Sequence, residues 1–275
     1  MPALYNIPYY APAHTLRANL PSTEEIEAAE EINTKLFEGQ YVLIRPLEGE
    51  NMLYVSHETD VPIPRVYAIY QKRDSAGRTC TYIIMEHIEG QPLNNCWGSL
   101  DLATKESIAS QLHASFDQLR SLGPPDYFGS LHRRPLYDGL FLTDDEKPRI
   151  NGPFGSVADL AEALVLKLQH EDEQFPAERT AYYRRVLPRV LRGDGRIRFA
   201  HADIQTKNLM LTPNGRVVIL DWQSAGWYPS YWEYAVALFC CGLWTDDFHA
   251  WMPKFLDEYP NEYLWLANIR TFLWY

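Results

Sequence analysis

Three side chains at fixed spacing are the first sign of chemistry in the sequence. Asp203 and Asn208 flank a short loop between two predicted strands, and Asp221 follows directly after the apolar run 217–220. A hairpin can bring all three to one end of these strands. Asn208 and Asp221 offer two oxygen ligands, which suits Mg²⁺ because this ion binds a few protein oxygens together with phosphate and water. Asp203 is then left to orient or deprotonate a hydroxyl group.

The joint pattern resembles the catalytic segment of the aminoglycoside phosphotransferase and choline kinase family, relatives of the protein kinases. His201 stands two residues before Asp203, Asn208 stands five after it, and Asp221 ends an apolar run. The kinase pattern H-R-D-x-x-x-x-N followed by D-F-G has the same spacing. The resemblance implies that Asp203 is the catalytic base and His201 an orienting residue. It also implies that Asn208 and Asp221 bind Mg²⁺. A set of loop-capping Asp and Asn side chains is the alternative.

The segment 82–90 resembles the strand and linker that hold the adenine ring in the same family. The resemblance implies that Glu86 and Ile88 supply a backbone carbonyl and a backbone N–H, with Met85 facing the nucleotide. Backbone recognition leaves no side-chain pattern, so an ordinary edge strand is the alternative interpretation.

The N-terminal part departs from the family pattern. The segment 47–55 resembles the helix that carries a phosphate-positioning glutamate, which implies Glu48, with Glu50 as second candidate. The matching lysine is Lys35, although a solvated surface lysine is an equal alternative. No glycine-rich strand pair precedes Lys35, so the N-lobe is predicted to lack the hairpin that covers ATP. The resemblance predicts a Lys35–Glu48 contact within about 4 Å.

The order of the remaining elements follows from hydrophobic periodicity and turn residues. The sequence predicts an arm over 1–21, a linker over 89–92, and Tyr231 to Glu233 as the anchor of the helix after the metal loop. The predicted helices cover 22–33, 48–58, 101–122, 156–171, 176–191 and the chain from 230 onward; the predicted strands cover 35–37, 41–44, 65–70, 81–85, 196–200, 209–211 and 217–220. The expected fold class is therefore α+β, two-lobed and protein-kinase-like, with an N-lobe over 1–87 and a helical C-lobe over 88–275.

Composition and charge limit the partners. With 46% hydrophobic and 22% charged residues, the 275-residue chain is globular and not disordered, collagen-like or coiled-coil. Its net charge of −11 repels a phosphate backbone, so we expect no nucleic-acid partner. The charge is compatible with a cationic acceptor, but an acidic surface that serves solubility explains it as well.

Targeting signals are not evident in the sequence. The longest apolar run, 235–244, is about half the length that spans a bilayer. No apolar signal segment follows the N-terminus, and the four cysteines lack a CxxC spacing. We therefore expect no membrane partner and a reducing, cytoplasmic location.

The resemblance implies transfer of the γ-phosphoryl group of ATP, or of another nucleotide such as GTP, to a hydroxyl of a small molecule. Family members act on aminoglycosides, choline, ethanolamine, homoserine and other acceptors, and the sequence does not choose among them. Acidic residues near the C-terminus could meet an amine on the acceptor, but a solvated helix face explains them equally: Asp246, Asp247, Asp257 and Glu258.

Two other functions stay open at this point. A shortened N-lobe favours a pseudokinase or a nucleotide-binding interaction module. A metal-dependent hydrolase could use His201, Asp203 and Asp221, although the window 195–225 contains only one histidine.

Overall fold

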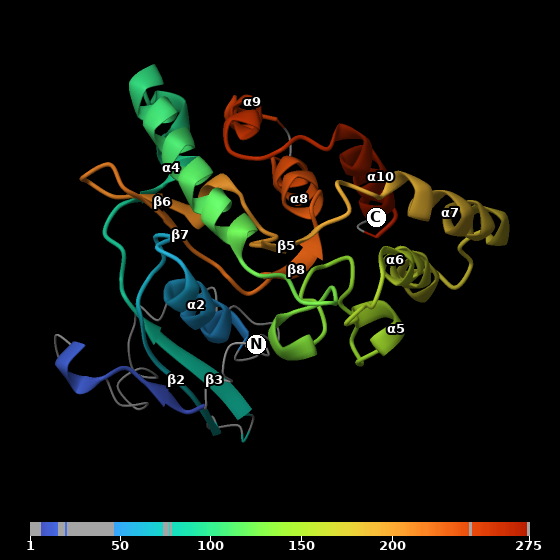
Figure 1. Cartoon of the computed structure of the whole chain (residues 1–275), viewed down its shortest axis with the longest axis horizontal. Coiled ribbons are helices and arrows are strands. Elements are labelled where there is room, and N and C mark those ends of the chain that lie inside the picture. The colour runs from blue at the N-terminus through green and yellow to red at the C-terminus, as the bar shows by residue number, and fades with distance from the viewer. Residues whose placement is uncertain are drawn as a thin grey trace.

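The computed structural model describes residues 7–15, 20, 47–73, 77, 79–241 and 244–273. In the described residues, a small sheet and helix α2 (Leu47–Glu58) make up the N-terminal part, and a larger, mainly helical part follows (Figure 1). The strands are β1 (Tyr9–Tyr10), β2 (Val66–Arg73), β3 (Thr79–Met85), β4 (Gln91–Pro92), β5 (Ile197–Ala200), β6 (Leu209–Leu211), β7 (Val217–Ile219) and β8 (Gly226–Pro229). The helices are α2 (Leu47–Glu58), α3 (Leu93–Cys96), α4 (Leu102–Ser121), α5 (Pro148–Asn151), α6 (Val157–Glu171), α7 (Ala177–Val190), α8 (Trp232–Cys240), α9 (Phe248–Trp251) and α10 (Pro260–Thr271). This is the predicted α+β architecture.

The two strands predicted at 65–70 and 81–85 pair with each other in the N-terminal sheet. β2 and β3 pair antiparallel, and Ile69 lies opposite Ile83 on the face that α2 covers. Gly49 allows this close approach, because a Cβ there would lie 2.5 Å from Cδ1 of Ile69. Two residues of the predicted arm form β1, which extends the sheet along β2. The helix and strands predicted between residues 22 and 44 lie outside the described residues.

The described strands of the C-terminal part form two separate sheets. β6 and β7 pair with each other and with β4, which occupies part of the predicted linker. β5 pairs instead with β8, a strand that hydrophobic periodicity did not predict. The β8 segment is buried at every position and contains Gly226 and Pro229, so it shows no alternation of apolar and polar residues.

The core joins the two parts of the molecule. Tyr54 of α2 packs edge-on against Phe199 of β5 at a ring distance of 5.3 Å and lies 6.4 Å from Trp227 of β8. A second buried cluster joins α6, α7, α8 and α10. α2 is therefore fixed against the strands that border the candidate site. None of the described helices combines the length and the hydropathy needed to cross a bilayer.

Gly90 tests the contact between the segment after β3 and the C-terminal part. A Cβ at Gly90 would lie 2.5 Å from the backbone oxygen of Leu211. Gly90→Ala should therefore lower the free energy of unfolding by about 1–3 kcal/mol, the usual cost of overpacking, measured by urea denaturation. Gly98→Ala is the control, because nothing lies within 4 Å of the position that a Cβ would take there. Equal stability of the two variants would contradict the close approach.

Candidate active site

Asp203 lies in the loop between β5 and β6, where two amide side chains hold its carboxylate. Oδ1 accepts a hydrogen bond from Nε2 of Gln205 at 2.6 Å, and Oδ2 accepts one from Nδ2 of Asn208 at 2.9 Å. Burial raises the pKa of Asp203, while the charge of Lys207 and these two bonds oppose the rise. Asp203 and Asn208 are thus in direct contact, and the carboxylate has a fixed orientation.

His201 connects this loop to the end of β7. Its Nδ1 accepts the backbone N–H of Asp203 at 3.2 Å, so the ring proton resides on Nε2, which donates to the carbonyl of Leu220 at 2.9 Å. The side chain is fully buried, and this burial lowers the pKa of His201 to about 4. The neutral imidazole therefore links Asp203 to the residue that precedes Asp221. This geometry is compatible with the orienting role predicted for His201.

Asn208 and Asp221 come together through Leu220. The backbone N–H of Leu220 donates to the carbonyl of Asn208 at 2.8 Å. Because Nδ2 of Asn208 is committed to Asp203, its amide oxygen is the atom that can bind a cation. Asp221 has a left-handed backbone with φ of 64°, an uncommon conformation for a residue other than glycine. In the described part of the chain, no three His, Cys, Asp or Glu side chains gather into a metal-binding group.

Helix α2 is bonded to the segment that follows Asp221. Asn51 donates through Nδ2 to the carbonyls of Trp222 at 2.8 Å and Ala225 at 3.1 Å. Glu48, in the first turn, accepts the backbone N–H of Trp222. Burial and the negative charge of Asp221 raise the pKa of Glu48 to about 7. The two carboxyl groups thus lie close enough to interact electrostatically, and a cation beside them would relieve this repulsion.

The second glutamate candidate has a different partner. Glu50 is buried and forms an ion pair with Arg134, from the loop that follows α4. Of the two glutamates, Glu48 is therefore the one beside Asp221. Lys35, its predicted partner, lies outside the described residues, so the Lys35–Glu48 contact stays a prediction.

Glu233 is a site residue whose position the sequence did not reveal. Its two carboxylate oxygens accept the backbone N–H groups of His201 at 2.6 Å and Ala202 at 3.1 Å. Ala202 has a left-handed backbone with φ of 62°. The glutamate was predicted to anchor its own helix, and its carboxylate also holds the start of the loop that carries Asp203. A single acid in the first turn of the apolar, buried helix α8 is the signal that could have indicated a distant partner.

Residues 36–273 match the phosphotransferase enzyme family, APH. The chain belongs to this family. No curated protein matches the chain.

Three solved structures illustrate what this phosphotransferase family member is similar to. The streptomycin–ATP ternary complex of APH(2")-IIa is 14% identical, with a TM-score of 0.43, over 68% of this chain and 57% of that chain. A thermostable mutant of aminoglycoside phosphotransferase APH(4)-Ia in its apo form is 18% identical, with a TM-score of 0.47, over 83% and 73%. A ternary complex of a thermostable APH(4)-Ia mutant with ADP and hygromycin B is 17% identical, with a TM-score of 0.48, over 80% and 72%. The chain thus spans 57% of the first relative's length.

The predicted adenine-binding segment of the phosphotransferase connects β3 with β4. The backbone N–H of Glu86 donates to the carbonyl of Arg65 at 2.8 Å. Within the described residues, the carbonyl of Glu86 and the N–H of Ile88 have no hydrogen-bond partner. These two groups can therefore pair with the edge of a base, and Met85 beside them is exposed.

The acidic residues that could contact an amine on the acceptor are spread over the C-terminal part. Asp247 accepts hydrogen bonds from Lys105 at 2.7 Å and from the indole N–H groups of Trp97 and Trp251. Glu258 accepts one from Tyr234. These bonds explain both carboxylates structurally. Lys207 is exposed to solvent beside the loop.

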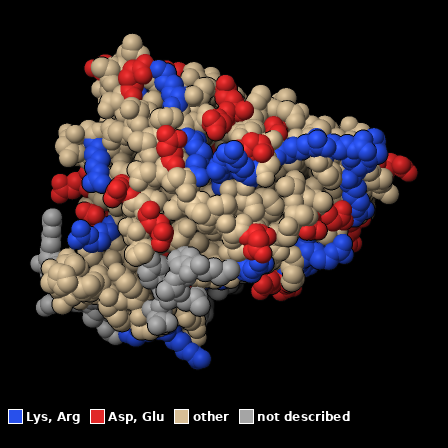
Figure 2. All heavy atoms as spheres, in the orientation of Figure 1, with Lys and Arg blue, Asp and Glu red and all other residues tan. Residues whose placement is uncertain are grey.

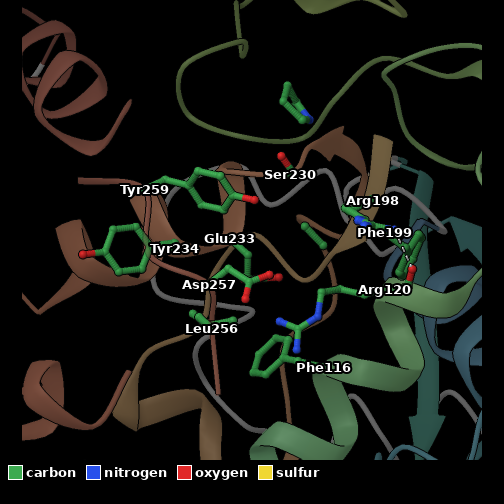
Figure 3. A pocket seen from close by; sticks show the side chains of 12 residues that line it. Phe116, Arg120, Arg198, Phe199, Ser230, Glu233, Tyr234, Leu256, Asp257 and Tyr259 are labelled. Atoms are coloured by element: carbon green, nitrogen blue, oxygen red, sulfur yellow. Dashed lines mark hydrogen bonds between the residues drawn. The ribbon is translucent and has the colours of Figure 1, made fainter. Parts of the chain in front are cut away.

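Glu233 lines a pocket that is open to solvent (Figure 3). Its wall comes from α4, β5, α8 and the loop before α10, and includes Arg120, Arg198, Glu233 and Asp257. Neither Asp203, Asn208 nor Asp221 lines it. The pocket therefore adjoins Glu233 and not the residues of the predicted chemistry.

The buried Glu233 carboxylate predicts a pH-dependent stability. Burial raises its pKa from 4.5 to about 7, even though the two backbone N–H groups oppose the rise. The folded state then binds the proton more tightly than the unfolded state, so this group's contribution to stability falls as pH rises from 4.5 to 7. Glu233→Gln removes that titration. The variant should gain up to ~3 kcal/mol relative to wild type between about pH 5 and pH 8.

Urea denaturation at both pH values measures this difference. Glu178→Gln, at an exposed position in α7, is the control and should leave the pH dependence unchanged. An unchanged stability difference between Glu233→Gln and wild type at the two pH values would contradict the burial of a charged carboxylate.

Proposed function

We propose that the chain transfers the γ-phosphoryl group of ATP to a hydroxyl group of a small molecule. The observation that carries this proposal is the fixed carboxylate of Asp203, bonded to Asn208 and joined through His201 to the residue before Asp221. Family membership supports phosphoryl transfer as the reaction. The nucleotide, the metal and the acceptor are inferences from the side chains.

Asp203 acts as the base in this proposal. Gln205 and Asn208 hold its oxygens in place, so the carboxylate can receive the proton of an acceptor hydroxyl without rotating. Burial raises its pKa, which moves the base toward the working pH and improves proton transfer. His201 stays neutral and positions the backbone of Asp203.

Asn208 and Asp221 are the proposed ligands of Mg²⁺. Their donor set fits this ion, because both side chains offer oxygen and because the negative charge of Asp221 already raises the pKa of the nearby Glu48. When bound, Mg²⁺ neutralises charge on the nucleotide phosphates. The free carbonyl of Glu86 and the N–H of Ile88 would hold the adenine edge, with Lys35 and Glu48 positioning the phosphates.

The proposed acceptor is a small molecule with a hydroxyl group. Streptomycin, gentamicin and hygromycin B are the compounds in the complexes of the similar structures. Whether the acceptor of this chain is cationic is a question for a screen of amino-alcohols, aminoglycosides and sugars that measures acceptor-dependent release of ADP. We also propose the division into an N-lobe over 1–87 and a C-lobe over 88–275, and a cytoplasmic location.

The geometry of His201 argues against the metal-dependent hydrolase. Both ring nitrogens are occupied, one by the Leu220 carbonyl and the other by the Asp203 N–H, and the ring is fully buried. His201 therefore has no lone pair to offer a metal ion. A measurement of turnover distinguishes the phosphotransferase from a nucleotide-binding module without catalysis.

Asp203→Asn should lower phosphoryl transfer by about 10²–10⁴-fold, since it removes a positioned base. Nucleotide binding should stay close to that of wild type, because the amide keeps the volume of the side chain. Steady-state ADP release with an acceptor found by the screen measures the first quantity, and calorimetry measures the second. Asp60→Asn, an exposed acid outside the catalytic loop, is the control and should keep full turnover. Wild-type turnover in Asp203→Asn would eliminate the base assignment.

Asp221→Ala should weaken binding of the Mg²⁺–nucleotide complex more than binding of the metal-free nucleotide. The reason is that the variant loses one of the two proposed oxygen ligands but none of the proposed adenine contacts. Calorimetric titrations with Mg²⁺ and with EDTA provide the comparison. If wild type binds nucleotide equally well under both conditions, the chain does not use a metal at this site. Binding without any turnover would support the nucleotide-binding module.

A further inference from the structure

Helix α7 and the turn after it form a concentrated basic segment in an acidic protein. Residues 177–198 contain seven arginines and only two acidic residues, whereas the whole chain has a net charge of −11. A band of Lys and Arg atoms crosses the surface over α7 (Figure 2). The local charge of this end of the molecule is thus opposite in sign to the overall charge.

Four of these arginines are exposed and have no acidic partner among the residues that the structure describes. Arg184 pairs with Glu162, Arg196 and Arg198 pair with Asp194, and Arg179 lies over the ring of Phe272. The remaining three form no ion pair with any described residue: Arg185, Arg189 and Arg192. Arg185 and Arg189 lie one turn apart on α7, and Arg192 follows shortly after the helix ends at Val190. Their guanidinium groups are therefore available to an anionic partner.

Apolar side chains lie beside these arginines. Tyr182 is 44% exposed, and its ring lies 6.4 Å from that of Trp265 in α10. Leu264 is 65% exposed. It lies between two α10 residues that bond to α7: Asn261, which donates to Val190, and Asn268, which accepts from Tyr183. Leu264 is consequently on the α7 side of its helix.

The position of α7 suits contact with a flat partner. Helix α7 lies at one end of the long axis of the molecule (Figure 1). At physiological salt, charges more than about 8 Å from a partner are largely screened. A partner that touches only this end is therefore little affected by the acidic surface elsewhere. The net charge, on which the expectation of no nucleic-acid partner was based, therefore does not govern this surface.

We propose that the α7 surface, defined by Tyr182, Arg185, Arg189, Arg192 and Leu264, docks on a bilayer that contains anionic phospholipids. Arginine binds headgroup phosphate through paired N–H groups, and exposed aromatic and aliphatic side chains favour the interface between headgroups and acyl chains. A nucleic acid would satisfy the arginines but leave Leu264 in water. The inference does not depend on the proposed phosphotransferase reaction.

Vesicle sedimentation of the full chain tests the proposal. At low salt, we expect binding to phosphatidylcholine vesicles with about a third phosphatidylserine and none to pure phosphatidylcholine, with weaker binding at higher salt. Arg185→Glu with Arg189→Glu should lower the partition coefficient at least about thirtyfold, given the usual contribution of each basic residue. Leu264→Ser should weaken binding without changing its dependence on salt.

The matched control is Arg149→Glu with Arg216→Glu, which changes the net charge equally at exposed positions outside α7. It should bind almost as wild type does, and thermal denaturation should show that all variants are folded. Three results would overturn the proposal: no binding of wild type to phosphatidylserine vesicles, an equal loss in the control variant, or arginine-dependent binding to an RNA oligonucleotide without binding to vesicles.

Discussion

The arrangement of the candidate site depends on the two hydrogen bonds that the neutral imidazole of His201 forms. One ring nitrogen accepts the N–H of Asp203, and the other donates to the carbonyl of Leu220, the residue before Asp221. If the ring were protonated, Nδ1 would carry a hydrogen that points at the N–H of Asp203. Two donors would then face each other, so this geometry requires a neutral ring. Burial lowers the pKa of His201 to about 4 and keeps the ring in the form that joins the two segments.

The same site concentrates carboxyl groups at a cost in stability. Burial raises the pKa values of Glu48 and Glu233 to about 7, and neighbouring acids, Asp221 and Asp203 respectively, add to the rise. Backbone N–H groups offset part of this cost at both residues. A fold selected only for stability would replace such groups with neutral ones. At Glu48 this cost is understandable if a cation and a phosphate bind beside Asp221, whereas Glu233 holds the backbone N–H groups of His201 and Ala202.

Helix α2 shows how the N-terminal part takes part in the site. Asn51 bonds to two carbonyls after Asp221, and Glu50 pairs with Arg134 of the C-terminal part. These buried polar contacts fix the helix that carries Glu48 against the loop that carries Asp221. The local charge at α7 also differs from the net charge of the chain. There, arginines form a basic surface on an acidic protein.

Local patterns in the sequence determined the elements and the spacing of the central residues. The helix predicted over 101–122 is found as α4, which Asp101 caps and in which Ile108, Leu112 and Phe116 are buried on one face. His201, Asp203 and Asn208, whose spacing indicated a common site, likewise lie in one loop. Only the tertiary structure decided that β5 pairs with β8 and that Glu233 supports a loop 32 residues earlier in the chain. Periodicity and caps report on neighbours along the chain, whereas a buried carboxylate or a two-sided buried strand finds its partner through packing between distant segments.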